Sequence, residues 1–350
     1  MAKQEANLAA VLPAIATDLV VEEREVPSPG PDDVLIRNHA IALNPVDWKR
    51  QSWGFMISSY PVVLGADIAG TVVEVGSSVS SFKPGDRVLG FADAFISGDN
   101  NRGAYQTYTA ARAISTAKLP DAISFQQGAT LPTAMGTAAM ALFDSFGLPR
   151  PTRATAASAL PGRPSILVWG GASSVGSVAI QLARLAGLTV FATASERHHT
   201  HLHSLGASVL VDYHSPTAVQ DLLAAVDKAG TPLLYALDTI STAETAPLVT
   251  QALSRSGGTV TKKLAHLIPW PEKVARPGGI EYYQIQGEEL WNRRQDLSAW
   301  LCNEISAWLE GGAVVPKQYR VVEGGLTGLQ NALNELKKGV SGEKLVVELN

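Results

Sequence analysis

The pattern of hydrophobic and polar positions along the chain changes near residue 130. Before that point, short apolar runs such as VLIRNHAIAL (34–43) and TVVEV (71–75) lie between closely spaced glycines and prolines. The segment GAYQTYTAAR (103–112) alternates in polarity and is rich in aromatic side chains. These features are typical of short strands joined by tight turns, so we expect a small, irregular, barrel-like β domain.

After residue 130 the chain alternates between helix and strand patterns. Small residues dominate 126–147, which predicts one long helix, and Pro, Ala and Ser dominate 148–164, which predicts a surface loop without chemistry. Apolar strands are then predicted at 165–170, 188–194, 207–213, 233–239 and 257–263, with helices at 175–187, 196–205, 216–229 and 242–254. Strands separated by helices in this way indicate a parallel sheet covered on both faces.

The last part of the chain predicts a helix at 296–312, a strand at 316–323, a further helix and a final strand at 343–349. We therefore divide the chain into a β-rich domain (1–130), an α/β domain (131–285) and a C-terminal segment (286–350) that returns to the first domain. The predicted fold class is α/β, with a doubly wound parallel sheet beside a β-rich domain.

Composition and charge narrow the classes of protein to which the chain can belong. Hydrophobic residues make up 46% of the chain and charged residues 17%, which fits a well-buried globular protein. A net charge of −4 with scattered basic residues gives no general attraction for nucleic acid or acidic membranes. The single cysteine, Cys302, excludes an internal disulfide and lies in an apolar helical stretch. With no signal-peptide pattern and no apolar run of about 18 residues, we expect a cytoplasmic protein.

A glycine-rich turn follows the first strand of the α/β domain. In VWGGASSVGS, Gly171, Ser173 and Gly176 stand where a dinucleotide-binding fingerprint places its three glycines. The first glycine allows the turn, the second lets the backbone approach a pyrophosphate, and the third lets the helix pack closely. Ser173 departs from this pattern, but it is small and able to donate to a phosphate. We expect Ser174 and Val175, at the helix start, to bind phosphate too, with a plain α/β turn as the alternative.

The end of the next strand indicates which nucleotide binds. An Asp or Glu that holds a free ribose 2′-hydroxyl is expected about twenty residues after the turn, but Ala194 stands there. Ser195, Arg197 and His198 follow, and a hydroxyl together with a cation suits a 2′-phosphate. We therefore predict NADPH rather than NADH, although Glu196 is within reach of a ribose.

Two histidines of the following helix, His199 and His203, have the i, i+4 spacing of some metal sites. No nearby carboxylate or cysteine completes a ligand set. We interpret them as the solvated start of a helix beside the phosphate site and predict no metal there.

Five segments together resemble the medium-chain dehydrogenase/reductase superfamily, in its quinone-reductase-like branch. They are NPVDWK (44–49), VLGADIAGTVVEVG (63–76), FKPGDRVLGF (82–91), GAYQTY (103–108) and LPTAMGTAAMAL (131–142). The segments fall in the family's order, and the resemblance covers nearly the whole chain. It implies a GroES-like catalytic domain and a Rossmann domain that binds the cofactor.

Zinc alcohol dehydrogenases of that superfamily carry a Cys near position 44 and Gly-His-Glu near 65 to 67. This chain has Asn44 in the first place and Gly65, Ala66 and Asp67 in the second. The stretch 91–103, where those enzymes hold a structural zinc, contains no cysteine. These side chains do not make a zinc site, so we expect a zinc-free enzyme. Without a Lewis acid a carbonyl is hard to polarise, and an activated C=C is the easier hydride acceptor.

A closer resemblance connects the chain with fungal trans-acting enoyl reductases of the lovastatin type and with related secondary-metabolite cluster dehydrogenases. It rests on YALDTIS (235–241), the Pro-rich insert after FGLP, SVLVDYHSP (208–216) and the ending GVSGEKLVVEL (339–349). This resemblance implies NADPH-dependent reduction of an α,β-unsaturated acyl thioester. The substrate would be carried by an acyl carrier protein of a polyketide synthase, and the enzyme would act in trans as a monomer or homodimer.

The resemblance also implies roles for single residues. The Lys of the family's NPxDxK motif is Lys49, expected near the nicotinamide, where it orients the cofactor or relays a proton; a surface lysine over Trp48 is the alternative. Thr137 matches a threonine near the nicotinamide, or else it packs the helix. Further cofactor contacts are expected from Asn44, Pro45, Asp47, Trp48, Tyr213, Val340 and Ser341. For Asn44 and Asp47 the alternative role is to hold the turn. For Tyr213 the alternative is core packing at a strand end, and for Val340 and Ser341 it is a turn before the last strand.

The acyl substrate is expected in a cleft between the domains. Aromatic and other large apolar side chains are the candidates for its contacts, and each is also compatible with ordinary core packing. They are Trp53, Phe55, Met56, Tyr60, Phe91, Phe95, Tyr105 and Tyr283. The segment 268–291 is aromatic and contains Pro and Gly, so we predict a loop that shapes a long acyl site.

Two other functions stay open at this point. A quinone or enone reductase acting on small free substrates would share the fold and the hydride step but would need no carrier protein. A non-catalytic NADPH-binding partner protein would keep its function when Lys49 is replaced by alanine.

Overall fold

The computed structural model describes residues 6–152, 160–257 and 260–349, and its contacts divide the chain into two compact units. Unit 1 contains residues 1–133, 294–310 and 316–350, and unit 2 contains residues 134–293 and 311–315. The last part of the chain therefore belongs mostly to unit 1, and the second boundary lies at residue 293, where the sequence analysis placed it at 285.

Unit 1 is built on two β-sheets. The larger sheet has seven strands, in the order β15-β16-β3-β5-β6-β8 with β7 also paired to β3, and a three-stranded sheet has the order β2-β1-β4. The strands are β1 (Asn7–Leu12), β2 (Val20–Arg24), β3 (Asp33–Ala42), β4 (Val62–Val63), β5 (Asp67–Val75), β6 (Arg87–Phe91), β7 (Tyr108–Arg112), β8 (Thr116–Lys118), β15 (Tyr319–Val321) and β16 (Lys344–Glu348). This is the predicted β-rich domain, completed by strands from the C-terminal segment.

Helices cover the sheets of unit 1. They are α1 (Pro45–Trp53), α2 (Ala94–Ser97), α3 (Phe125–Ala129), α10 (Gln295–Glu310) and α11 (Gly325–Lys338), with 3₁₀ turns η1 (Asn100–Arg102) and η2 (Ala113–Ser115). Helix α11 repeats leucines at 326, 329 and 333, which lie on one face of a helix. These leucines belong to the buried cluster that also contains side chains of β1, β3 and β5.

Unit 2 contains a six-stranded sheet in the order β11-β10-β9-β12-β13-β14, and every pair of neighbours is parallel. Its strands are β9 (Ser165–Trp169), β10 (Thr189–Thr193), β11 (Val209–Val211), β12 (Leu233–Asp238), β13 (Lys262–His266) and β14 (Ile280–Gln284). Chain order reverses at β9, because β10 lies on one side of it and β12 on the other. This is a doubly wound sheet, which confirms the predicted fold class.

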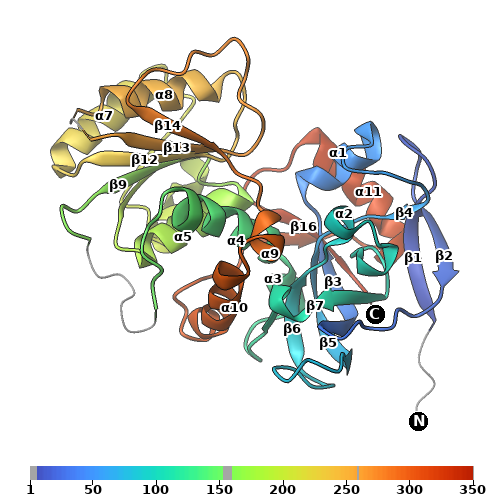
Figure 1. The fold of residues 1–350 in the computed structure, drawn as a ribbon. Coiled ribbons are helices and arrows are strands. Elements are labelled where there is room, and N and C mark those ends of the chain that lie inside the picture. Colours follow the sequence, from blue (N-terminus) through green and yellow to red (C-terminus); the bar gives the residue numbers. More distant parts are fainter. Residues whose placement is uncertain (1–5, 153–159, 258–259, 350) are drawn as a thin grey trace. The chain divides into compact units, whose positions relative to one another are not determined.

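Helices lie on both faces of this sheet, with α7 and α8 on one face and α5 on the other (Figure 1). The helices of unit 2 include α5 (Ser174–Leu185), η4 (Glu196–His198, 3₁₀), α6 (His199–Leu205), α7 (Ala218–Ala229), α8 (Thr245–Arg255) and α9 (Glu289–Asn292). Because both faces are covered, β9 is buried at every position, as its unbroken apolar run requires.

Three predicted elements differ from those observed. The single helix at 126–147 is instead α3, α4 (Pro132–Ala139) and a π-helical segment η3 (Met140–Ser145). Pro132 has no N–H to donate to the preceding turn, so it begins a new helix. In the π-helical segment the Phe146 N–H donates to the Ala141 carbonyl at 3.0 Å, five residues earlier.

The predicted loop at 268–291 contains the edge strand β14 and the helix α9, so that prediction is wrong. The run IEYYQ is rich in aromatic and β-branched residues, and its strand propensity outweighs the flanking Pro and Gly. The strand predicted at 257–263 begins later, at Lys262, and its positions 258 and 259 lie outside the described residues. Residues 153–159 of the loop predicted at 148–164 also lie outside them.

No helix among the described residues is long and apolar enough to cross a membrane.

Candidate functional site

After β9, helix α5 packs as closely on the glycine-rich turn as the dinucleotide-binding fingerprint requires. Gly170 has a φ of 82°, in the left-handed region, and Gly171 N–H donates to the Thr193 carbonyl of β10 at 2.8 Å. A Cβ placed on Gly176 would lie 2.3 Å from the Gly170 carbonyl oxygen. Only glycine at position 176 lets α5 pack this closely on the turn, which is the geometry of the fingerprint's third glycine.

The side chain of Ser173 stabilises this turn by hydrogen bonding. Its Oγ accepts the Gly176 N–H at 2.9 Å and donates to Thr239 Oγ1 at 2.9 Å, so it is the N-cap of α5. Thr239 in turn donates to the Trp169 carbonyl at 2.8 Å. In this arrangement the Ser173 hydroxyl proton is directed at Thr239 rather than at a ligand. The next N–H groups of the helix, those of Ser174 and Val175, have no acceptor inside a helix and are the donors suited to an anion.

The carboxyl end of β10 brings together several residues predicted to bind the nucleotide. Ala194 is buried, and its N–H donates to the Val211 carbonyl at 3.1 Å. Ser195 donates through Oγ to the Tyr213 hydroxyl at 3.2 Å, and Arg197 Nε lies 3.2 Å from His198 Nε2. Strands β10 and β11 are neighbours, which explains why Ser195 and Tyr213 meet.

Two residues at this edge were not predicted from the sequence. Asp212 follows β11 directly, and its Oδ1 lies 2.7 Å from Nδ1 of His214. Hydrogen bonds from the backbone and the side chain of His214 lower the pKa of Asp212, and the His214 ring stacks on Tyr213 at 4.1 Å. The sequence did contain a signal for Asp212, because a carboxylate directly after an apolar strand lies at the ligand-binding edge of such a sheet.

The two histidines with metal-like spacing bind different backbone carbonyls. His199 Nε2 lies 2.9 Å from the Ala194 carbonyl oxygen, and His203 Nδ1 lies 2.8 Å from that of Ala207. Within the described parts of the chain, no group of three or more His, Cys, Asp or Glu residues is arranged to hold a metal ion.

Unit 1 contains a buried polar cluster. The Lys344 ammonium of β16 contacts the Asp67 carboxylate, and it donates to Asn44 Oδ1 at 3.0 Å. Asn44 Nδ2 donates to Asp67 Oδ2 at 2.9 Å, so these three side chains all bond to one another. The other carboxylate oxygen, Oδ1, accepts the Thr133 N–H at 2.8 Å and hydroxyl at 2.6 Å. The cluster therefore joins the α1 turn, β5, β16 and the first turn of α4.

This cluster does not fit a zinc ion. Asn44 and Asp67 stand at two of the positions where the zinc enzymes of the superfamily have ligands, and Ala66 at a third has no donor atom. The Asn44 and Asp67 oxygens already bind the Lys344 ammonium, whose positive charge repels a metal cation. Sequence analysis missed Lys344, because nothing in its local pattern shows a partner 277 residues earlier.

The turn before α1 is held by the side chains that the sequence marked as possible cofactor contacts. Asp47 Oδ2 accepts the Asn44 N–H at 2.7 Å, and Pro45 begins the helix. Burial raises the pKa of Asp47 to about 6. Asn44 and Asp47 are both buried, which favours their predicted alternative role of holding the turn.

Lys49 lies on α1 beside aromatic rings. Its Nζ is 5.8 Å from the centroid of Trp48, and Nζ of Lys337 is 5.9 Å from the same ring. The Trp53 ring meets Trp48 edge to face at 5.0 Å. Burial lowers the pKa of Lys49, a change in the direction that proton transfer near neutral pH requires.

The other predicted site residues are divided between the two units. Trp53, Tyr60, Phe95, Tyr105, Val340 and Ser341 belong to unit 1, and Thr137 and Tyr283 belong to unit 2. The Tyr283 hydroxyl donates to Glu281 at 2.6 Å, and this bond raises the pKa of Tyr283 to about 12. Thr137 is buried against the backbone of Gly287.

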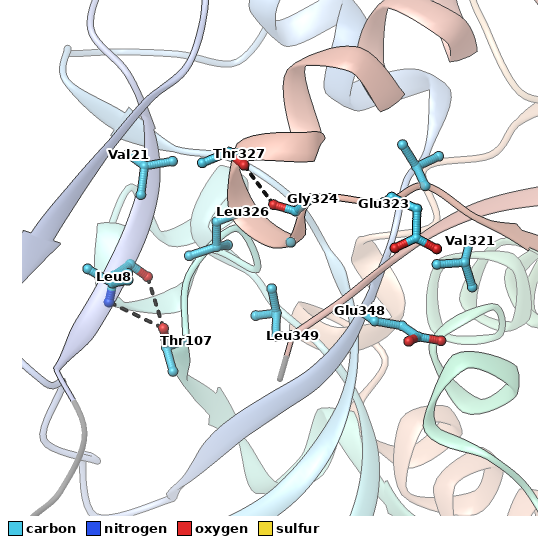
Figure 2. A pocket seen from close by; sticks show the side chains of 12 residues that line it. Leu8, Val21, Thr107, Val321, Glu323, Gly324, Leu326, Thr327, Glu348 and Leu349 are labelled. Carbon is cyan, nitrogen blue, oxygen red and sulfur yellow. Dashed lines mark hydrogen bonds between the residues drawn. The ribbon is translucent and has the colours of Figure 1, made fainter.

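A surface groove of about 420 Å³ in unit 1 lies away from these residues. Figure 2 shows it between Leu8 and Val21 on one side and Leu326 and Leu349 on another, with hydrogen bonds from Leu8 to Thr107 and from Thr327 to Gly324 among the residues that line it. None of the predicted site residues lines it, so we do not place the active site there.

Comparison with known proteins gives consistent results. Residues 30–121 match the alcohol dehydrogenase GroES-like domain. The trans-enoyl reductase tndF of Aspergillus flavipes is 36% identical over 346 residues, covering 97% of this chain and 98% of that protein. The dehydrogenase azaJ of Aspergillus niger is 37% identical over 354 residues, covering 98% and 99%. The solved CurK enoyl reductase has the same fold, with a TM-score of 0.78 at 20% identity over 99% of this chain and 100% of that one.

These matches extend over nearly the whole chain, and they agree with the doubly wound sheet and the β-rich unit described above. The chain therefore belongs to the medium-chain dehydrogenase/reductase superfamily of oxidoreductases, and within it to the group of fungal trans-enoyl reductases and related dehydrogenases.

Proposed function

We propose that the protein is an NADPH-dependent, zinc-independent enoyl reductase, which reduces the C=C of a polyketide-type α,β-unsaturated acyl thioester presented by the acyl carrier protein of a polyketide synthase. The observation that carries the proposal is the buried Lys344 ammonium, bonded to Asn44 and Asp67 at positions where zinc enzymes hold their metal. Without a metal to polarise a carbonyl, the acceptor best suited to a hydride is an activated C=C.

In this proposal unit 2 holds the cofactor. A bound nicotinamide cofactor supplies the hydride that adds to the β-carbon of the substrate. Ser174 and Val175 would direct their N–H groups at the pyrophosphate, and Gly176 permits that approach. Ser195, Arg197 and His198 would bind the 2′-phosphate, and Tyr213 would pack beside the adenine.

In unit 1 the proposed catalytic group is Lys49. Its ammonium would stabilise the enolate charge that develops on the thioester oxygen, and Nζ would hold the proton destined for the α-carbon. The lowered pKa of Lys49 supports this role, since a less strongly held proton is transferred more readily. Thr137 is proposed to contact the nicotinamide.

The test of the function follows NADPH absorbance at 340 nm with a short enoyl thioester and, in parallel, a simple quinone. We expect turnover of the thioester, no comparable turnover of the quinone, and a large loss of thioester turnover in Lys49→Ala. Turnover of the quinone alone would contradict the proposal and would indicate a reductase that acts on small free substrates. NADPH binding without turnover of either substrate, also when the thioester is on a carrier protein, would indicate a non-catalytic protein.

The predicted choice of cofactor has its own test in Arg197→Ala. This change removes the cation proposed to bind the 2′-phosphate, and charge-assisted hydrogen bonds contribute about 1.5–3 kcal/mol. We expect the Kd of NADPH to rise about 10- to 100-fold and that of NADH to stay within about 3-fold, measured by fluorescence titration. Lys228→Ala, which removes an exposed cation on α7, is the control. Equal losses for the two cofactors would show that Arg197 does not read the 2′-phosphate.

A further inference from the structure

Helix α1 buries a guanidinium in the interior of unit 1. Arg50 is only 2% exposed, and among the described residues neither its Nε nor its Nη1 has a hydrogen-bond partner. Its Cζ lies 5.6 Å from the centroid of the Phe95 ring. An aromatic face attracts a cation but accepts no strong hydrogen bond, so two guanidinium nitrogens keep unused donors.

Two tyrosine hydroxyls lie near Arg50. The Tyr60 hydroxyl is buried and has no hydrogen-bond partner within the described part of the chain, whereas the Tyr105 hydroxyl bonds to the Asp47 carboxylate. Both tyrosines lie within electrostatic range of Arg50. The Tyr105 ring packs against Gly65, whose added Cβ would lie 2.3 Å from Cδ1 of that ring, so the tyrosine is fixed in place. Arg50 and Tyr60 therefore both carry unused donors in one region of unit 1.

The segment between Arg50 and Tyr60 exposes large apolar side chains, in contrast to these buried polar groups. Trp53, Phe55 and Met56 are 62%, 51% and 42% exposed, although apolar side chains of this size are usually buried. Met56 also has a φ of 53°, in the left-handed region that side chains other than glycine rarely adopt. The segment thus places apolar groups outside and unpaired polar groups inside, an arrangement that a bound acyl chain with a polar substituent would complement.

The charge of this region favours a neutral ligand atom. Asp47 lies within electrostatic range of Arg50, so the guanidinium is already balanced by a carboxylate. An unpaired buried donor costs about 1–3 kcal/mol, and a carbonyl oxygen, with two acceptor positions and no charge, would relieve that cost without adding a charge. A ligand carboxylate would instead leave the region with an excess of negative charge.

We propose that Arg50 and Tyr60 bind a keto oxygen on the tail of the acyl substrate, and that Trp53, Phe55 and Met56 close over its hydrocarbon part. The proposal rests on the proposed enoyl reductase function and adds a substrate class to it, a keto-substituted acyl chain. Arg50 is then a specificity-determining residue, distinct from Lys49, which acts on the thioester end.

The test is a binding measurement that needs no turnover. Calorimetry compares saturated acyl thioesters of one chain length, one with a plain alkyl tail and a series with a keto group at successive tail carbons. We expect at least one keto compound to bind the wild-type protein about tenfold more tightly than the alkyl compound, as expected for one additional charge-assisted hydrogen bond. Arg50→Met should abolish this preference and leave the alkyl affinity within about threefold.

Two controls separate recognition from structure. Lys338→Met removes an exposed cation of α11 and should keep the preference. Tyr60→Phe removes only a hydroxyl that has no partner in the described chain, so it should fold normally and reduce the preference severalfold even if Arg50→Met unfolds the protein.

The outcomes also separate this proposal from the proposed function. No keto preference in the wild-type protein, or equal losses for keto and alkyl compounds in the variants, would overturn the role of Arg50 and show that its burial is structural. A keto preference that depends on Arg50, in a protein that turns over no enoyl thioester, would support the binding site and contradict the reductase activity.

Discussion

Replacing Lys344 by methionine should lower the free energy of unfolding by about 3–5 kcal/mol, the effect of removing one partner from a buried ion pair. Lys344 and Asp67 are both buried, and Asn44 bonds to both of them. Methionine fills a similar volume but leaves the carboxylate without its cation. Denaturant unfolding followed by circular dichroism measures the loss, and a loss below about 1 kcal/mol would show that the pair contributes little.

A double variant shows whether the uncompensated charge is the cause. Asp67→Asn in the Lys344→Met background removes that charge while keeping an oxygen that accepts from the Thr133 N–H and hydroxyl. We expect it to recover at least half of the lost stability, because a neutral amide is far less costly to bury than a lone carboxylate. If the double variant were no more stable than Lys344→Met, the lost packing of the lysine stem would be the cause.

Gly176→Ala should disrupt the glycine-rich turn after β9, which we propose to bind the cofactor. Its Cβ would lie 2.3 Å from the Gly170 carbonyl oxygen and 2.9 Å from the Gly171 Cα, and neither backbone atom can rotate away. The start of α5 must then move from the turn, and overpacking of this kind costs about 1–3 kcal/mol. We expect the Kd of NADPH to rise about 10- to 100-fold, with the secondary structure of unit 1 retained.

Gly278→Ala is the matched control for this change. No atom lies within 4 Å of a Cβ placed on Gly278, and it too belongs to unit 2. It should bind NADPH as the wild-type protein does. If Gly176→Ala bound NADPH equally well, the close approach of α5 to the turn would not be needed for the cofactor.

The sequence predicts the fold well where the signal is local. The unbroken apolar run of β9 and the helix predicted between the last two strands both appear in the structure as expected. Prediction from the sequence fails where residues that favour different structures lie in the same segment. Pro and Gly around IEYYQ suggested a loop, yet the aromatic residues form the edge strand β14. Pro132 likewise divides a stretch of small residues that looks like one helix.

The sequence predicts only those site residues that belong to a short sequence motif. Gly171, Ser173 and Gly176 were found because their spacing within one short stretch of chain matches the dinucleotide-binding fingerprint. Lys344 was not, since it meets Asn44 across 300 residues of sequence and only the packing of β16 against β3 brings them together. Arg50 was missed for a related reason, because the letters WKR do not reveal that one cation is half-buried and the next is fully enclosed.

Transfer of deuterium from NADPH labelled at C4 of the nicotinamide tests the central claim most directly. The labelled cofactor is incubated with an enoyl thioester, and the product is examined by mass spectrometry and NMR. We predict a saturated acyl thioester with deuterium on the β-carbon and an intact carbonyl, formed equally well after treatment with a metal chelator. Deuterium on the carbonyl carbon, or a reaction that stops after chelation, would contradict the account.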